Sequence, residues 1–106
     1  MLSEIIKDVF KISGVSNVYY LKEHNILIDT GSIEDKQLLE KNLSNVVNLD
    51  KIKTVIFTHL HYDHSANISL FKNAKFYASK KEIDNFKKDP LGSVLNPVVA
   101  KDLKNI

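Results

Sequence analysis

Three of the four histidines in this 106-residue chain fall within six consecutive positions, at His59, His61 and His64. Asp63 lies between the last two, so this short stretch offers three imidazoles and one carboxylate. Neutral imidazole and carboxylate oxygen are the usual nitrogen and oxygen ligands of Zn²⁺ and its first-row neighbours. A polar loop that happens to be rich in histidine is the plainer interpretation, but four ligand-type residues at this spacing favour a metal site.

An apolar segment over residues 53–57 leads into the histidine stretch and is predicted to be a buried strand, because it is rich in β-branched and aromatic residues. If the strand continues through His61, then His59 and His61 project to the same side, since side chains alternate along a strand. These two histidines would then converge on one metal ion. Asp63 and His64 are adjacent, so they share a target only if the chain turns there. The simplest geometry is two neighbouring sites, one for each pair.

Asp29 is a further candidate, because it follows another predicted strand over residues 25–29. Residues 32–45 predict a helix, so the strands at 25–29 and 53–58 are expected to be parallel neighbours joined by a crossover. That arrangement brings Asp29 and His59 to the same end of the sheet. There Asp29 would accept a hydrogen bond from the ring N–H of a metal-binding histidine. The alternative is an Asx-type turn, in which the carboxylate only caps the local backbone.

The composition is that of an ordinary globular chain, with 43% hydrophobic residues, 26% charged residues and a formal net charge of +2. The length fits a single domain over residues 1–106. So small a charge, with scattered lysines, argues against a nucleic-acid partner. No apolar run has the length of a membrane span and residues 1–4 are no signal peptide, so a cytoplasmic location is expected. The absence of cysteine means that any zinc must use nitrogen and oxygen ligands.

The run from His59 to His64, H-x-H-x-D-H preceded by threonine, resembles the signature of the metallo-β-lactamase superfamily of hydrolases. Residues 26–31, Ile-Leu-Ile-Asp-Thr-Gly, are similar to the strand and turn that this family places upstream. The resemblance implies a four-layer αββα sandwich, of which this chain would be the N-terminal αβ half, with a mixed sheet and flanking helices. One departure is Ala66, where the family usually has glycine. Alanine is acceptable there unless the position needs a positive φ.

The resemblance also bears on residues 2–12, whose apolar pattern alone favours a helix over a strand. Because the family begins with an antiparallel meander, we expect a strand there. Residues 15–21 and 25–29 are predicted to pair as a hairpin, with His24 as a solvated residue in its turn. The later segments predict a short helix at 67–71, a strand at 74–78, a helix from 79 to about 88 ended by Asp89-Pro90, and a last helix from Asn96-Pro97.

For the site, the resemblance implies hydrolysis by metal-bound hydroxide at two metal ions, expected to be zinc, with iron or manganese as alternatives. His59 and His61 would hold the first ion, and Asp63 and His64 the second. Asp63 could also orient the attacking water or carry its proton. A histidine at position 61, where the oxygen-reducing di-iron members carry glutamate, favours hydrolysis over redox chemistry. The expected substrate is a small ester, thioester or lactone.

Two ligands for each ion are fewer than the three or four protein ligands of stable zinc sites. In a complete member of the family, the other ligands lie beyond the segment that corresponds to this chain. We therefore expect the chain alone to bind metal weakly and to be inactive or weakly active. Its expected partner is a complementary C-terminal half or, in a homo-oligomer, a second copy, either of which would cover an exposed apolar face. The alternative function is that of a catalytically silent remnant serving as a binding or interaction module.

Overall fold

The computed structural model describes residues 1–106 and contains one six-stranded sheet, in which the strands lie side by side in chain order. Strands β1 to β4 pair antiparallel, whereas β4, β5 and β6 pair parallel. This confirms the predicted mixed sheet, including the hairpin of β3 and β4 and the parallel crossover from β4 to β5. The strands are β1 (Leu2–Ile6), β2 (Val9–Ile12), β3 (Val18–Leu21), β4 (Ile26–Ile28), β5 (Thr54–Ile56) and β6 (Lys75–Tyr77).

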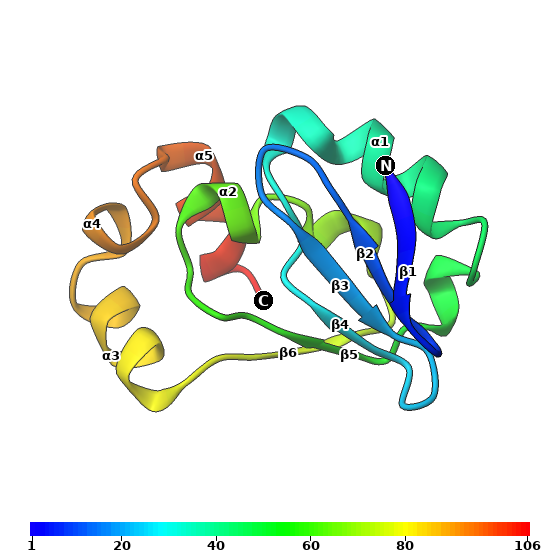
Figure 1. The fold of residues 1–106 in the computed structure, drawn as a ribbon. Helices are drawn as coiled ribbons and strands as arrows, with labels where there is room; N and C mark the ends of the chain where they lie inside the picture. Colours follow the sequence, from blue (N-terminus) through cyan, green and yellow to red (C-terminus); the bar gives the residue numbers. More distant parts are fainter.

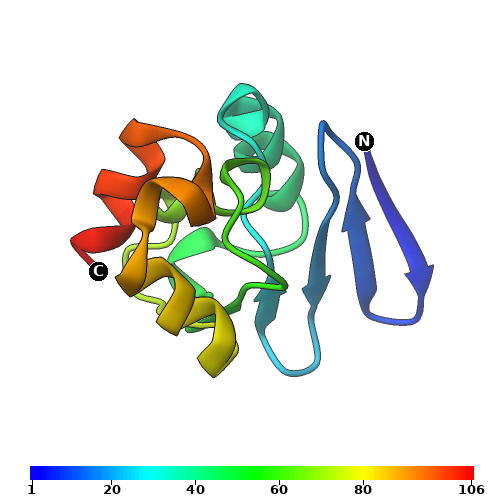
Figure 2. The ribbon, with the colours of Figure 1, turned by 90° about the vertical axis from the view of Figure 1, so that its left-hand side faces the viewer.

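The helices flank this sheet in two groups. Helix α1 runs along the sheet, whereas α3, α4 and α5 gather at the end of the strand order farthest from β1 and β2 (Figure 1, Figure 2). None of them has the length and apolar character needed to cross a membrane. The helices are α1 (Lys36–Leu43), α2 (Tyr62–Ser65), α3 (Lys80–Lys88), α4 (Pro90–Val94) and α5 (Pro97–Lys104), with the 3-10 turns η1 (Ile33–Asp35), η2 (Leu49–Lys51) and η3 (Ile68–Leu70).

The first twelve residues form a hairpin rather than one strand. β1 and β2 pair antiparallel around a turn at Lys7 and Asp8. Asp8 has a positive φ of 62°, and its N–H donates to the Glu4 carboxylate at 2.7 Å. Aspartate tolerates the left-handed conformation better than most residues. Asp8, which interrupts the apolar alternation in the sequence, is therefore the residue that turns the chain.

The segment after α3 differs from the prediction in a similar way. Asp89-Pro90 ends α3 as expected, but a further short helix, α4, begins at once. The Asp89 carboxylate caps it by accepting the N–H of Gly92 at 3.1 Å, and proline fits its first turn. The same chemistry starts α5, where the Asn96 side chain accepts two backbone N–H groups.

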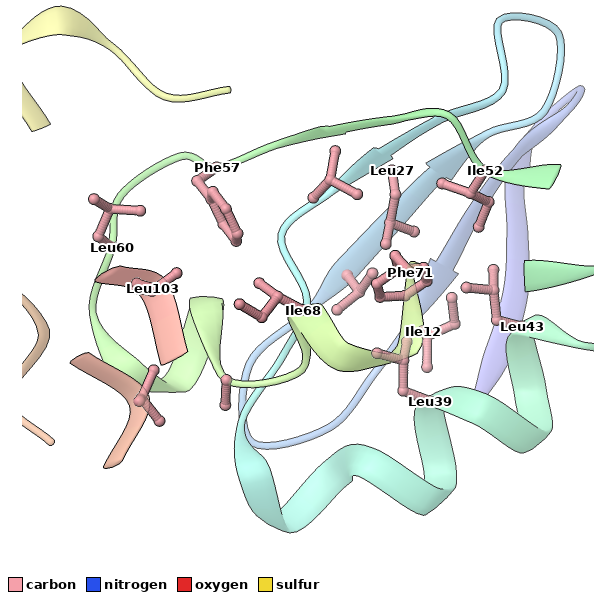
Figure 3. Packing of buried hydrophobic residues seen from close by; sticks show 14 of the residues in the cluster. Ile12, Leu27, Leu39, Leu43, Ile52, Phe57, Leu60, Ile68, Phe71 and Leu103 are labelled. Carbon is pink, nitrogen blue, oxygen red and sulfur yellow. The ribbon is translucent and has the colours of Figure 1, made fainter. Parts of the chain in front are cut away.

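One face of the sheet carries the core. A row of residues in register crosses five strands on this face: Phe10, Tyr20, Leu27, Val55 and Phe76. Figure 3 shows Ile12 and Leu27 of the sheet facing Leu39 and Leu43 of α1. Leu27 and Leu43 are fully buried. Burial also raises the pKa of the Tyr20 phenol, whose hydroxyl donates to the Asn25 side chain at 2.8 Å.

The opposite face of the sheet is also largely apolar but much less covered. The adjacent row in register is Lys11, Tyr19, Ile28, Ile56 and Tyr77. Ile56 and Tyr77 are 36% and 51% exposed, and Tyr19 and Ile28 are half-buried. We refer to Tyr19, Ile28, Ile56 and Tyr77 as the outer apolar row.

Leu27→Ala is expected to lower the free energy of unfolding by about 2–5 kcal/mol, because truncation of a fully buried side chain leaves a cavity. Leu91→Ala is the matched control. It makes the same chemical change at a side chain that is 54% exposed on α4, where a change within about 0.5 kcal/mol is expected. Denaturant unfolding of both variants measures the difference, and equal losses would contradict the assignment of Leu27 to the core.

Candidate metal centre

The histidine stretch lies in a loop at the carboxyl end of the parallel strands. β5 ends at Ile56, and His61 is already the N-cap residue of α2, with φ −55° and ψ 146°. The premise that the strand continues through His61 is therefore wrong. The physical reason is that the N–H of Thr58 donates to Asp29 Oδ1 at 2.8 Å, so a side chain takes the place of a strand partner at this point.

Asp29 is the buried centre of the hydrogen bonding around this loop. It directly follows β4, is 3% exposed, and adopts a left-handed φ of 65°. Besides the Thr58 N–H, it accepts the Thr58 hydroxyl at 2.7 Å, and its Oδ2 lies 2.8 Å from Nδ1 of His64. A buried carboxylate needs such partners to offset its lost hydration. Asp29 thus contacts a ring nitrogen of a candidate ligand, as its predicted role requires; the role itself concerns a bound metal and stays a prediction.

For the neutral form of each ring, these bonds assign the position of the ring proton. Because ionised Asp29 can only accept, the proton between it and His64 lies on Nδ1, and Nε2 of His64 keeps its lone pair. Thr58 Oγ1 already donates its hydrogen to Asp29, so it accepts at its 3.1 Å contact with Nδ1 of His59. In the neutral ring, Nε2 of His59 is therefore also unprotonated. Neutral rings with one nitrogen held and the other free are the form that binds metals.

Three ligand-type side chains converge at this point. His59, Asp63 and His64 each offer a ligand atom, and these atoms lie within 4.8 Å of one another. Nε2 of His64 is 3.7 Å from the Asp63 carboxylate, and the rings of His59 and His64 have centroids 4.0 Å apart. Two imidazoles and a carboxylate are a common donor set for zinc. The residues present therefore fit a divalent metal ion.

His61 lies next to this cluster without being part of it. Its ring centroid is 4.9 Å from that of His59, with the two planes perpendicular. The sequence grouped His59 with His61 and Asp63 with His64, whereas the structure groups His59 with Asp63 and His64. His59 contacts both neighbouring rings and so connects the two predicted pairs. His24 lies in the turn between β3 and β4, outside the cluster.

His59 and His61 open onto a polar pocket of about 520 Å³. The other lining residues belong to α3, α4 and the junction between them, and none is hydrophobic: Glu82, Asn85, Lys88, Asp89, Gly92 and Ser93. The pocket gives a small polar molecule access to the two imidazoles.

The turn after Asp29 and the chain after His64 are joined behind the cluster. Both the N–H and the hydroxyl of Thr30 donate to the backbone carbonyl of His64, at 2.7 and 3.1 Å. Buried Asn67 donates through its side-chain amide to the carbonyls of Thr30 and Ser32, both at 2.8 Å. The two segments singled out in the sequence therefore form one hydrogen-bonded unit.

Comparison with known proteins identifies the family. A sequence model of the Metallo-beta-lactamase superfamily matches residues 13–89. The chain belongs to this superfamily. A relative in Methanocaldococcus jannaschii, named "Probable metallo-hydrolase", is 46% identical over 65 residues, which are 58% of this chain and 32% of that protein.

Solved structures share the fold of this chain. The flavodiiron protein of Giardia intestinalis matches with a TM-score of 0.70 and 22% identity, over 84% of this chain and 27% of its own. A subclass B3 metallo-beta-lactamase of Bradyrhizobium japonicum matches with a TM-score of 0.68 and 22% identity, over 85% of this chain and 34% of its own. The chain thus spans about a third of the length of these relatives. At these identities the two structures establish the fold alone.

The one local departure from the superfamily pattern, at Ala66, does not strain the backbone. Ala66, at a position where glycine is usual, has φ −76° and ψ −23°. This is the right-handed helical region, which every residue adopts without strain. The alanine is therefore accommodated without strain.

Thr58 was not predicted as a site residue, although the sequence places it directly before His59. Thr58→Val removes the hydroxyl that accepts from Nδ1 of His59, so the neutral ring is expected to shift toward the tautomer protonated at Nε2. Thr58→Ser keeps the hydroxyl and is the control. Imidazole ¹⁵N chemical shifts of the metal-free chain measure the tautomer, and identical His59 shifts in both variants would contradict the assignment.

Asp29→Asn is expected to weaken zinc binding by about 10–100-fold, as loss of a carboxylate behind a ligand histidine typically does. Asparagine tolerates the left-handed backbone, but its amide nitrogen cannot accept the bonds that the carboxylate oxygens accept. Competitive zinc titration measures the effect. Asp50→Asn, which makes the same charge change at an exposed side chain, is the control. An Asp29 variant with unchanged affinity would rule out the proposed role.

Proposed function

We propose that this protein is a metal-dependent hydrolase whose cluster holds zinc, with iron or manganese as alternatives, and that it hydrolyses a small ester, thioester or lactone. The observation that carries the proposal is the convergence of His59, Asp63 and His64 within 4.8 Å. Asp29, buried behind them, adds a second reason, because a carboxylate hydrogen-bonded to a ligand histidine is a regular feature of metal sites.

Each residue has a role that follows from its contacts. His59 and His64 would bind an ion through Nε2, since Nδ1 of each ring is held by Thr58 or Asp29. Asp63, whose side chain is 34% exposed, would contribute a carboxylate oxygen or accept a proton from the attacking water. A bound divalent ion would supply Lewis acidity, polarising the scissile carbonyl and lowering the pKa of water.

A second ion is part of the proposal. The resemblance assigns His59 with His61 to one ion and Asp63 with His64 to the other. The perpendicular contact of His61 with His59 and the tilted contact of His59 with His64, at 4.0 Å between ring centroids, support two adjacent sites. The His61 ring makes no hydrogen bond within the chain and is exposed, so it can turn toward an ion at little cost.

We also propose that a complementary segment, equivalent to the other half of the αββα sandwich, completes the site. Three converging side chains and one neighbour are too few ligands for two stable zinc sites. The outer apolar row, with Ile56 and Tyr77 exposed, offers this segment a surface to cover with a second sheet. Since the chain spans 32% of its M. jannaschii relative, the larger part of such a protein is available to supply both the sheet and the ligands.

Metal content and hydrolysis together test the function. We expect the purified chain to bind zinc weakly and to hydrolyse a generic ester only when the part of the M. jannaschii relative outside the match is supplied as a separate polypeptide. His64→Ala should lose about 10-fold or more in zinc affinity, whereas His24→Ala, the control in an exposed turn, should not.

The outcomes separate the alternatives. Tight stoichiometric zinc in the lone chain would contradict the need for a complement. Neither metal nor hydrolysis with the complement present would overturn the hydrolase and favour a catalytically silent interaction module. Activity accompanied by self-association, without any complement, would indicate a site completed by a second copy.

A further inference from the structure

Helix α3 directs one carboxylate to the backbone of the histidine stretch. Oε1 of Glu82 accepts the N–H of Leu60 at 2.9 Å. Leu60 lies between His59 and His61 and is 7% exposed. The bond therefore fixes the backbone between two candidate ligands, from an element that is distant in sequence.

The carbonyl of Leu60 is held as well. It accepts the hydroxyl of buried Ser65 at 3.0 Å. Both backbone polar groups of Leu60 are thus hydrogen-bonded by side chains, one from α3 and one from the end of α2. A residue held on both sides cannot rotate its peptide planes freely, and the orientations of the adjacent His59 and His61 follow from those planes.

The sequence around Glu82 would direct its carboxylate elsewhere. Ser79-Lys80-Lys81-Glu82 is a capping-box pattern, in which the glutamate normally bonds back to the N–H of the capping residue. Ser79 does cap the helix, accepting the N–H of Glu82 at 3.2 Å, but the carboxylate bonds to Leu60 instead. The N–H of the exposed Ser79 can bond to water. Leu60, in contrast, is buried, and a buried N–H left without a partner costs about 1–3 kcal/mol. The Glu82 carboxylate therefore stabilises the chain more by bonding to Leu60 than to Ser79.

We propose that Glu82 is a positioning residue of the metal centre, which holds the peptide of Leu60 so that the backbones of His59 and His61 keep the separation and direction from which their rings can reach a metal ion. Glu82 also lines the polar pocket together with these two histidines, so its negative charge stands beside the imidazoles and favours a cation there. This inference rests on the proposed metal-dependent function and extends it to a residue outside the histidine motif.

Three variants test the proposal. Glu82→Ala removes the acceptor, whereas Glu82→Gln retains an acceptor oxygen of the same reach. Asp84→Ala is the matched control, because Asp84 lies on the same helix and is paired only with exposed Lys80. In the metal-free chain, Glu82→Ala is expected to speed hydrogen exchange of the Leu60 amide by about tenfold, in line with the loss of one bond. Glu82→Gln and Asp84→Ala should leave that rate near the wild-type value.

Zinc affinity separates positioning from simple packing of α3. Competitive titration should show about a tenfold loss for Glu82→Ala, substantial rescue by Glu82→Gln, and no loss for Asp84→Ala. Faster Leu60 exchange with unchanged zinc affinity and unchanged His59 and His61 ring shifts would overturn the proposal, since Glu82 would then only anchor the helix. Equal losses in Glu82→Gln and Glu82→Ala would also contradict it, because the hydrogen bond would not be the cause.

Failure of the metal function would be recognised separately. If the wild-type chain bound no zinc even with the complementary segment present, the hydrolase proposal would fall. Positioning by Glu82 would still be decided by the metal-free ¹⁵N shifts of His59 and His61, which should change in Glu82→Ala and recover in Glu82→Gln. Should Glu82→Ala fail to fold, Glu82→Asp, whose carboxylate is one methylene short of Leu60, replaces it with the same expectations.

Discussion

The buried carboxylate of Asp29 is the interaction on which the rest of the site depends. Burying a charge is costly unless donors surround it, and the donors here are the N–H and hydroxyl of Thr58 and Nδ1 of His64. Two of these donors belong to Thr58, where the chain leaves the sheet, and the third belongs to His64, a candidate ligand. The hydrogen bonds that stabilise the buried charge of Asp29 therefore also end strand β5, set the direction of the loop that follows and orient two imidazoles.

The sheet must bring Asp29 to this position, and the pairing of β4 with β5 does so. Leu27 is in register with Val55, and Ile28 with Ile56, so the residues that follow each strand emerge together. A shift of one residue would move the buried side chains to the other face of the sheet. The core row through Leu27 and Val55 therefore fixes the geometry of the site as well as the stability of the fold. The register of β4 with β5 thus places both the core residues and the residues of the site.

Much of this arrangement could be predicted from the sequence, because it follows from short-range patterns. The strand–helix–strand order placed Asp29 and His59 at the same end of the sheet, and the superfamily resemblance supplied the antiparallel meander. The turn at Asp8 was missed because a single polar residue within an apolar run fits either a spoiled strand or a hairpin. The bonds of Thr58 and Glu82 were missed for a different reason. They join residues far apart in the chain, which produce no periodic pattern in the sequence, and a glutamate three residues after Ser79 is typical of a local capping box.

The same hydrogen bonds hold the rings of His59 and His64 but not the ring of His61. His59 and His64 each have Nδ1 engaged and Nε2 free, so an ion that approached them would neither break a hydrogen bond nor shift a ring proton. His61 is exposed and its ring is not held, although its backbone neighbour Leu60 is. Prior ordering of ligands lowers the free energy spent on binding. If the chain binds metal as proposed, the first ion should therefore occupy the side of His59, Asp63 and His64, and His61 should be recruited only when further ligands stabilise a second ion.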